Sequence, residues 1–475
     1  MTADVDLAFL SARRIAALVR ERAVSPVEIT RLYLDRIDRL DGELRAYITV
    51  VPEAALESAR RAEAAVLRGE ALGPLHGVPY AVKDQFDTAG VRTTSGSRLL
   101  EHHVPTEDAT TISRLNGAGA ILLGKLNLTE FALGGTQKFP FGQPRNPWNL
   151  DHDPGGSSSG SGIAVAAALC AASLGEDTGG SVRSPASFCG VVGLRPTWSR
   201  VSRHGSFPLS WSMDTPGPLG RTVEDVAWLL QAIAGYDPKD PLSSRAPVPA
   251  YAKGLEDGVR ALRIGVIREL TSGPETDAEM KAAVLEAARC LERLGATIEE
   301  ISLPLLPRAG AIFMALADSD GAGVHHRWLR TRAAEYDQGT RRRLLTASLI
   351  PAAIQQRAAR ARALLGTQLR EALAGHDLLL CPTAHQAAPP IAAGRGVITS
   401  RHEVAGRFFT RRSYVTPAAL AGLPAIAVPC GFTCAGLPLS LQLIGRHFDE
   451  ATVLRAAHTY ESQFDWSRRR PPGAA

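Results

Sequence analysis

Glycine and serine dominate one short segment of the chain. Residues 154–162 read Pro-Gly-Gly-Ser-Ser-Ser-Gly-Ser-Gly, so eight consecutive residues are glycine or serine. An apolar, alanine-rich run at 163–174, predicted to be a buried helix, follows at once, which is unusual for a flexible linker. A phosphate-binding loop needs a lysine after its glycines, and this loop contains none. A rigid turn that presents hydroxyl groups is the third interpretation, because glycine allows backbone torsions that a Cβ forbids.

A second glycine-rich turn, at 177–183, reads Asp-Thr-Gly-Gly-Ser-Val-Arg. Successive amides in such a turn can point at one spot and form an oxyanion hole, with Ser181 beside it. A serine nucleophile needs a base, yet none of the 12 histidines lies in a motif typical of one. Lys83, at the end of the apolar run 78–82, is the remaining candidate, since a buried ammonium is costly unless neutral or partnered. Taken singly, a structural turn and a lysine that reaches solvent remain open alternatives.

Together these segments resemble the amidase signature family of serine hydrolases, whose catalytic group is a Ser–cis-Ser–Lys triad. The resemblance covers nearly the whole chain, from about residue 7 to residue 463, and its central signature is highly specific. The matching stretches occur in the family's order, with the stronger ones at 73–84, 154–158 and 177–197 and weaker ones at 124–132, 381–383 and 422–445.

The resemblance implies that Ser181 is the nucleophile, Ser157 the bridging serine and Lys83 the base. The separation of 24 positions between the two serines matches the family's register and favours Ser157 over Ser158. The family needs no metal or organic cofactor. The implied oxyanion hole consists of the amides of Thr178, Gly179, Gly180 and Ser181, and the implied supporting residues are Gly156, which precedes the cis bond, Asp177 and Arg183.

Two positions depart from the family's pattern. Glu176 stands where the family more often has serine or threonine, and Ser159 replaces a usual glycine. Neither change touches the triad, so they leave the substrate more open than the catalysis. Phe313, Met314 and Trp328 are candidates for an apolar acyl pocket, and they are equally suited to an ordinary core.

Two functions share this signature. The one we favour from the sequence is an amidase that cleaves the C–N bond of a small linear carboxamide through an acyl-serine, releasing ammonia or an amine. The alternative is the glutamine-hydrolysing A subunit of a tRNA-dependent amidotransferase, and the arginine- and alanine-rich region 308–374 is interpreted as divergent from such subunits. A catalytically dead binding module is disfavoured by the intact triad. The expected partner is a small-molecule amide, a homodimer is possible, and neither a membrane nor direct nucleic-acid contact is expected.

The composition is that of an ordinary globular chain. Its 475 residues are 45% hydrophobic and 21% charged, with a net charge of +5. The densest basic cluster, 341–343, is interpreted as the solvated face of an amphipathic helix rather than a nucleic-acid site. The six cysteines are mostly scattered and fit reduced thiols in the cytoplasm. Cys430 and Cys434 lack a second pair at ligand spacing, so no metal site is expected.

Helical patterns at 8–22, 25–40 and 52–68 predict an N-terminal helical segment, residues 1–70, packed on an amidase signature domain, residues 71–475. No signal peptide is visible, and the 12-residue apolar run at 163–174 is too short to cross a bilayer. Within the larger part, strands at 263–267 and 296–301 flank a helix at 276–294. Further helices are predicted within 308–374 and at 450–463, and strands at 378–380 and 425–429. The expected fold is a single large α/β domain with a mixed sheet core flanked by helices.

Overall fold

A single sheet of eleven strands runs through the part of the chain that the computed structural model describes, residues 6–391 and 400–474. In their order across the sheet, the strands are β1 (Tyr47–Val50), β3 (Ile121–Leu126), β2 (Pro79–Lys83), β4 (Ala172–Glu176), β6 (Pro216–Gly220), β5 (Val192–Arg195), β10 (Ala425–Phe432), β11 (Pro438–Gly445), β9 (Leu378–Pro382), β7 (Arg263–Ile267) and β8 (Thr297–Ile301). Strand β2 runs parallel to β3 and β4, whereas β10 runs antiparallel to β5 and β11. The sheet is mixed, which confirms the predicted α/β fold.

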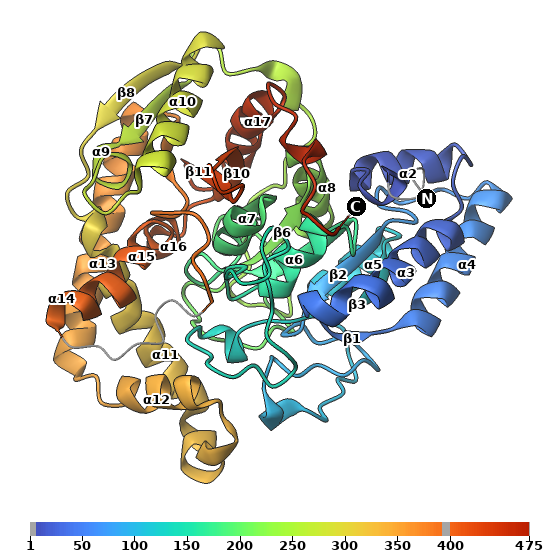
Figure 1. Ribbon diagram of the computed structural model, residues 1–475, viewed down its shortest axis with the longest axis horizontal. Coiled ribbons are helices and arrows are strands. Elements are labelled where there is room, and N and C mark those ends of the chain that lie inside the picture. Colours follow the sequence, from blue (N-terminus) through green and yellow to red (C-terminus); the bar gives the residue numbers. More distant parts are fainter. Residues whose placement is uncertain (1–5, 392–399, 475) are drawn as a thin grey trace.

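Helices surround the sheet, with an N-terminal group on one side and a long-helix group on the other (Figure 1). The described α-helices are α2 (Ala12–Arg20), α3 (Pro26–Leu44), α4 (Pro52–Arg68), α5 (Thr110–Gly117), α6 (Ser159–Ala166), α7 (Arg183–Cys189), α8 (Val223–Ile233), α9 (Arg268–Thr271), α10 (Ala278–Arg293), α11 (Ala309–Thr331), α12 (Gln338–Ala347), α13 (Ala352–Gly375), α14 (Arg401–Val404), α15 (Arg411–Ser413), α16 (Thr416–Ala421) and α17 (Glu450–Glu461). The predicted strand–helix–strand unit is confirmed, because β7 and β8 pair in parallel and flank α10. None of the described helices is long and apolar enough to cross a membrane.

The N-terminal segment begins its helices where the sequence predicts. The Ser25 hydroxyl accepts the amide hydrogens of Val27 (2.9 Å) and Glu28 (3.4 Å), which caps α3. Between α3 and α4, however, residues 47–50 form β1, which pairs antiparallel with β3 at the edge of the sheet. This strand lies between the helical patterns predicted at 25–40 and 52–68, and its Tyr-Ile-Thr-Val sequence favours a strand. The N-terminal segment is therefore not helical throughout. The division into residues 1–70 and 71–475 stays a prediction.

The apolar run 163–174 also differs from its prediction as one helix. Helix α6 ends at Ala166, Ala168 has a left-handed φ of 51°, and β4 begins at Ala172. A residue in that conformation interrupts a right-handed helix. The carbonyls of Ala167 and Ala168 accept hydrogen bonds from the buried Arg36 guanidinium (3.0 and 2.9 Å), so the broken helix end is satisfied. The chain therefore turns back into the sheet as strand β4. This strand leads into the glycine-rich turn at 177–183, called the signature turn below.

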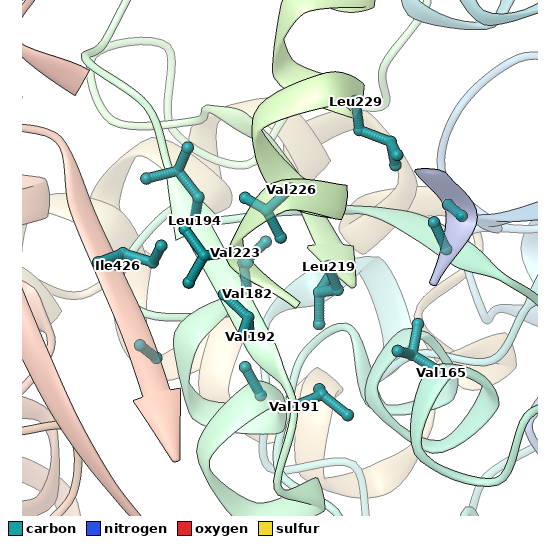
Figure 2. Packing of buried hydrophobic residues seen from close by; sticks show 14 of the residues in the cluster. Val165, Val182, Val191, Val192, Leu194, Leu219, Val223, Val226, Leu229 and Ile426 are labelled. Atoms are coloured by element: carbon teal, nitrogen blue, oxygen red, sulfur yellow. The ribbon is translucent and has the colours of Figure 1, made fainter. Parts of the chain in front are cut away.

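Apolar side chains from the middle strands and their covering helices form the main core. Figure 2 shows valine and leucine side chains of β5, β6 and α8 packed against one another, with Ile426 of β10 close by. The same cluster continues into the N-terminal helices through residues such as Ile15, Ile29 and Tyr33. The glycine-rich turns at 154–162 and 177–183 are thus held between rigid elements.

Candidate active site

Lys83 is the last residue of β2 and lies in the interior of the sheet. All five residues of this strand are buried, and Lys83 has no exposed surface. Its Nζ donates a hydrogen bond to the Ser157 Oγ (2.8 Å) and a longer one to the main-chain oxygen of Glu176 (3.3 Å). Lys83 is therefore a buried lysine held against a serine hydroxyl, not a lysine that reaches solvent.

Three consecutive serines follow Gly156, and their hydroxyls have different partners. The peptide bond between Gly156 and Ser157 is cis, as the resemblance implies. The Ser158 Oγ lies 3.3 Å from both the amide nitrogen and the carbonyl oxygen of Glu176. The Ser159 Oγ donates to the carbonyl of residue 155 (2.6 Å). Of these three hydroxyls, the one that meets the lysine is that of Ser157, the residue favoured by the register.

Ser181 lies in the turn between β4 and α7 and is partly exposed, unlike Lys83 and Ser157. The Ser158 amide donates to the Ser181 carbonyl (3.2 Å), so the two serine-bearing loops touch. A partly exposed serine on a loop that touches the loop of a buried serine–lysine pair is a candidate nucleophile. The structure thus brings the three predicted catalytic residues together, and their roles stay predictions.

Asp177 holds the shape of the signature turn. Its carboxylate accepts the amide hydrogens of Gly180 (2.7 Å) and Val182 (3.2 Å), and the Arg183 guanidinium donates to both oxygens (3.1 Å each). Arg195, from β5, donates to the Asp177 main-chain oxygen and to its carboxylate. Burial alone would raise the pKa of Asp177, but the two arginines hold it well below its usual range. These contacts agree with the supporting role implied for Asp177 and Arg183.

The predicted oxyanion hole loses one of its four amides to this arrangement. Because the Gly180 N–H already points at the Asp177 carboxylate, it is not free to bind a substrate oxygen. The amides of Thr178, Gly179 and Ser181 donate no hydrogen bond to another described residue. An oxyanion hole in this turn would use those three amides, and it stays a prediction.

Apolar side chains pack closely against the two glycines of the turn. A Cβ added to Gly179 would lie 2.3 Å from the Phe313 Cζ, and one added to Gly180 would lie 2.3 Å from the Val415 Cγ2. Gly180 also has a φ of 113°, which few L-residues adopt. Helix α11, which carries Phe313, and the segment before α16 therefore pack against the turn.

The other two pocket candidates lie in different surroundings. The Met314 sulfur is 3.5 Å from an Arg343 guanidinium nitrogen. Trp328 packs against Phe131, with ring centroids 5.8 Å apart, in a separate apolar cluster. Of the three candidates, Phe313 is the one in direct contact with the signature turn.

Burial controls the ionisation of the site. It lowers the pKa of Lys83 to about 8, against the opposing effect of Glu176, Asp177 and Asp214. A Glu176 carboxylate oxygen lies 3.7 Å from the Lys83 Nζ. Burial raises the pKa of Glu176 despite this lysine, and it raises that of Asp214 to about 7. A lysine with a pKa near 8 is neutral in an appreciable fraction of molecules at neutral pH, as a general base requires.

Arg195 and Asp214 were not among the residues predicted for the site. Arg195 ends a fully buried strand, and a charged residue directly after Val-Gly-Leu was a usable signal for a buried ion pair. Asp214 gave no local signal, because it meets Thr178 from 36 residues away through a hydrogen bond of 2.7 Å.

Comparison with known proteins decides the family. The model of the Amidase family matches residues 28–454. The chain belongs to the amidase signature family. Members of this family are hydrolases that act on amide C–N bonds, and this enzyme is one of them.

This amidase signature enzyme is similar along its full length to amidotransferase subunits. It is 42% identical to the A subunit of the glutamyl-tRNA(Gln) amidotransferase of Moorella thermoacetica, covering 98% of this chain and 99% of that one. The crystal structure of the corresponding A subunit from Thermotoga maritima matches with a TM-score of 0.82 at 33% identity, over 97% and 96% of the two chains. The peptide amidase of Stenotrophomonas maltophilia matches with a TM-score of 0.84 at 32% identity, over 97% and 98%.

The names of these relatives overturn one expectation. A small-molecule amide was the predicted substrate, with no direct nucleic-acid contact and a possible homodimer. The relatives at about 40% identity are, by name, one subunit of a larger enzyme, an amidotransferase of glutamyl-tRNA(Gln). The expectation was wrong because the catalytic signature is shared across the family, whereas partners are determined by surfaces that carry no motif.

Proposed function

We propose that this protein hydrolyses glutamine as the A subunit of a tRNA-dependent amidotransferase. The observation that carries the proposal is the match to subunits of that name over 98% of this chain at 42% identity. It replaces the stand-alone amidase favoured from the sequence. The proposed reaction would take place where aminoacyl-tRNA is found, in the cytoplasm.

The proposed chemistry uses the hydrogen bond between Lys83 and Ser157 and the contact between the loops of Ser157 and Ser181. Ser181 Oγ attacks the carboxamide carbon and gives its proton to Ser157, which passes its own proton to neutral Lys83. Free amides of the signature turn stabilise the oxyanion. The proton then returns through Ser157 to the leaving nitrogen, which departs as ammonia. Water cleaves the acyl-Ser181 ester and yields glutamate.

Arg343 and Arg412 form a positively charged cluster that suits the carboxylate of an amino acid, and Arg343 also contacts Met314, the neighbour of Phe313. A Cβ on Gly134 would lie 3.6 Å from an Arg343 nitrogen and 3.9 Å from an Arg412 nitrogen, so the two guanidiniums gather at one place. Asp318, on the same helix as Phe313, binds Arg343 at 2.5 and 2.9 Å. Two arginines against this one carboxylate leave a net positive charge. Arg343, expected on a solvated helix face, thus turns inward.

The test is ammonia release by the purified full-length protein, with glutamine compared with simple aliphatic and aryl amides. We expect glutamine to be the better substrate by about tenfold or more in kcat/KM. Addition of glutamyl-tRNA and the other subunits of a related amidotransferase should increase glutamine turnover. Ser181→Ala is the blank. The proposal would be overturned if the protein hydrolysed simple amides but released no more ammonia from glutamine than the Ser181→Ala blank does.

A second variant pair tests the carboxylate site. Arg412→Met should raise KM for glutamine by about tenfold and leave kcat nearly unchanged, because it removes a binding contact. The matched control is Arg411→Met, a change of the exposed neighbour, which should leave both constants unchanged. Equal effects of the two changes would contradict the assignment.

A further inference from the structure

The Thr178 hydroxyl lies between two buried carboxyl groups. Its Oγ1 is 2.7 Å from an oxygen of Asp214 and 3.1 and 3.3 Å from the two oxygens of Glu176. The three residues are 0–6% exposed. A hydroxyl has one hydrogen, so it can donate to only one of the two carboxyls. The other carboxyl must carry a proton and donate it to the hydroxyl oxygen, since two buried carboxylates this close repel.

The Glu176–Thr178–Asp214 hydrogen-bonded bridge lies next to Lys83, the proposed base. Glu176 offers Lys83 both a carboxylate oxygen, at 3.7 Å, and its main-chain oxygen, at 3.3 Å. The Glu176 carboxylate is also held by the amide of Thr215 (3.1 Å). Two main-chain amides of the turn before Asp214 donate to its other oxygen (2.8 and 2.9 Å). The position of each carboxyl is therefore determined by the backbone and not by the lysine.

Other charged groups surround the bridge on both sides. On the inner side, Asp177 faces Lys83 and Glu176 but is neutralised by Arg183 and Arg195. On the outer side, Asp214 lines a cleft of about 210 Å³. The charged and titratable groups in that cleft are Arg203, His204, Lys239 and Asp240. Arg203 pairs with Asp240 at 3.4 Å and Lys239 pairs with Glu107 at 3.2 Å, so the cleft adds little net charge next to the bridge.

We propose that Glu176 and Asp214 share one proton through the Thr178 hydroxyl, and that Glu176 is thereby a positioning residue for Lys83. The inference rests on the proposed role of Lys83 as the base. Because the two carboxyls together hold one negative charge, the proton's location decides whether that charge lies beside the amine or farther away. Glu176 is not one of the three triad residues, so it would act on the base from outside the triad.

Substitutions of the two carboxyl residues should shift the midpoint of the pH–activity curve in opposite directions. Glu176→Gln removes the anion nearest the amine, so Lys83 loses its proton more easily and the basic limb moves down by about one pH unit. Asp214→Asn lets the Thr178 hydrogen turn to Glu176, which then stays ionised beside Lys83. The limb should move up by about one unit. A purely structural role would lower the amount of reactive protein and would leave the midpoint in place.

The measurement is the rate at which a fluorophosphonate probe labels Ser181 in the full-length protein, from about pH 6 to about pH 10. The probe reports on the triad whatever the natural substrate is. Glu461→Gln is the matched control, because this carboxyl is half-buried and its pKa is raised to about 8, but it binds the Val223 amide (3.0 Å) at the start of α8. The control should keep the native midpoint.

Opposite shifts for Glu176→Gln and Asp214→Asn would support the proposal, and unchanged or parallel midpoints would overturn it. Thr178→Ser keeps the bridging hydroxyl and should retain the native midpoint. If Glu176→Gln does not fold, Glu176→Ser provides the same test with a smaller side chain. No labelling of the native protein would overturn the triad and this inference together, whereas labelling without glutamine hydrolysis would overturn only the proposed substrate.

Discussion

Two buried lysines on neighbouring strands have closely similar surroundings. Lys83 ends β2, and Lys125 lies in the parallel strand β3, opposite the residue that precedes Lys83. Neither side chain is exposed, and each amine is 3.7 Å from a carboxylate oxygen, of Glu176 and Asp84 respectively. Burial lowers the pKa of both lysines to about 8. Neither burial nor the pKa distinguishes them.

The hydrogen-bond partners of the two lysines distinguish them. The Lys125 amine donates to the main-chain oxygen of Phe86 and to the hydroxyls of Thr88 (3.0 Å) and Thr93 (2.8 Å). Three acceptors use all three hydrogens of an ammonium, so Lys125 is fixed as a structural cation. Lys83 instead donates to Ser157, whose loop touches that of the partly exposed Ser181. The feature that identifies a buried lysine as a candidate base is therefore a hydrogen bond to a hydroxyl group that can transfer a proton.

The largest expected effect tests the end of that hydroxyl path. Ser181→Ala removes the attacking atom, so amide hydrolysis and probe labelling should fall by about a thousandfold or more. Thermal unfolding should change little, because the side chain is partly exposed. Residual turnover above about one thousandth of the native rate would contradict the nucleophile assignment.

Changing each lysine to methionine should have different effects, on activity for Lys83 and on stability for Lys125. Lys83→Met should abolish hydrolysis, about a thousandfold or more, in a protein that still folds. Lys125→Met leaves three acceptors and Asp84 without their cation, so the free energy of unfolding should fall by about 3 kcal/mol. Its folded fraction should keep activity within about tenfold of the native value. Activity assays combined with denaturant unfolding measure both quantities, and the reverse pattern would exchange the two roles.

The path from Lys83 should depend on one serine of three. Ser157→Ala should lower activity by about a hundredfold or more, because it removes the bridge. Ser158→Ala and Ser159→Ala should cost less than about tenfold, since those hydroxyls bond to the backbone of residues 176 and 155. Steady-state kinetics of the three variants provide the ranking. A larger loss at Ser158 would mean that the register has been assigned wrongly.

The smallest effect is the pH dependence of the native enzyme. The pKa of Lys83 is lowered from 10.5 to about 8, so the amine is protonated and inactive below that pH and neutral above it. Activity should therefore rise along a single basic limb with a midpoint near pH 8, changing about tenfold per unit below it. Lys83→Arg should not restore activity, because a guanidinium keeps its proton. A flat profile with an active arginine variant would point to a different base.

Much of the fold could be predicted from local patterns. Ser25 with its following proline marked the start of α3, and the β7–α10–β8 unit followed from apolar spacing. The prediction of one helix over 163–174 was wrong, because the chain takes a left-handed conformation at Ala168 and enters the sheet as β4 at Ala172. Strand β1 was not predicted, since its four residues are too few to show a period, and its pairing with β3 is seen only in the assembled sheet.

The sequence points to Lys83, Ser157 and Ser181 through its resemblance to the amidase signature family, and their catalytic roles stay predictions. Which amides of the turn stay free, that Phe313 covers Gly179, and that Asp214 joins Glu176 through Thr178 all depend on segments far apart in the chain. Such contacts leave no trace in local composition. A buried carboxyl or guanidinium is stabilised by whatever the fold places within about 3 Å of it, and that partner is known only once the sheet and its helices are assembled.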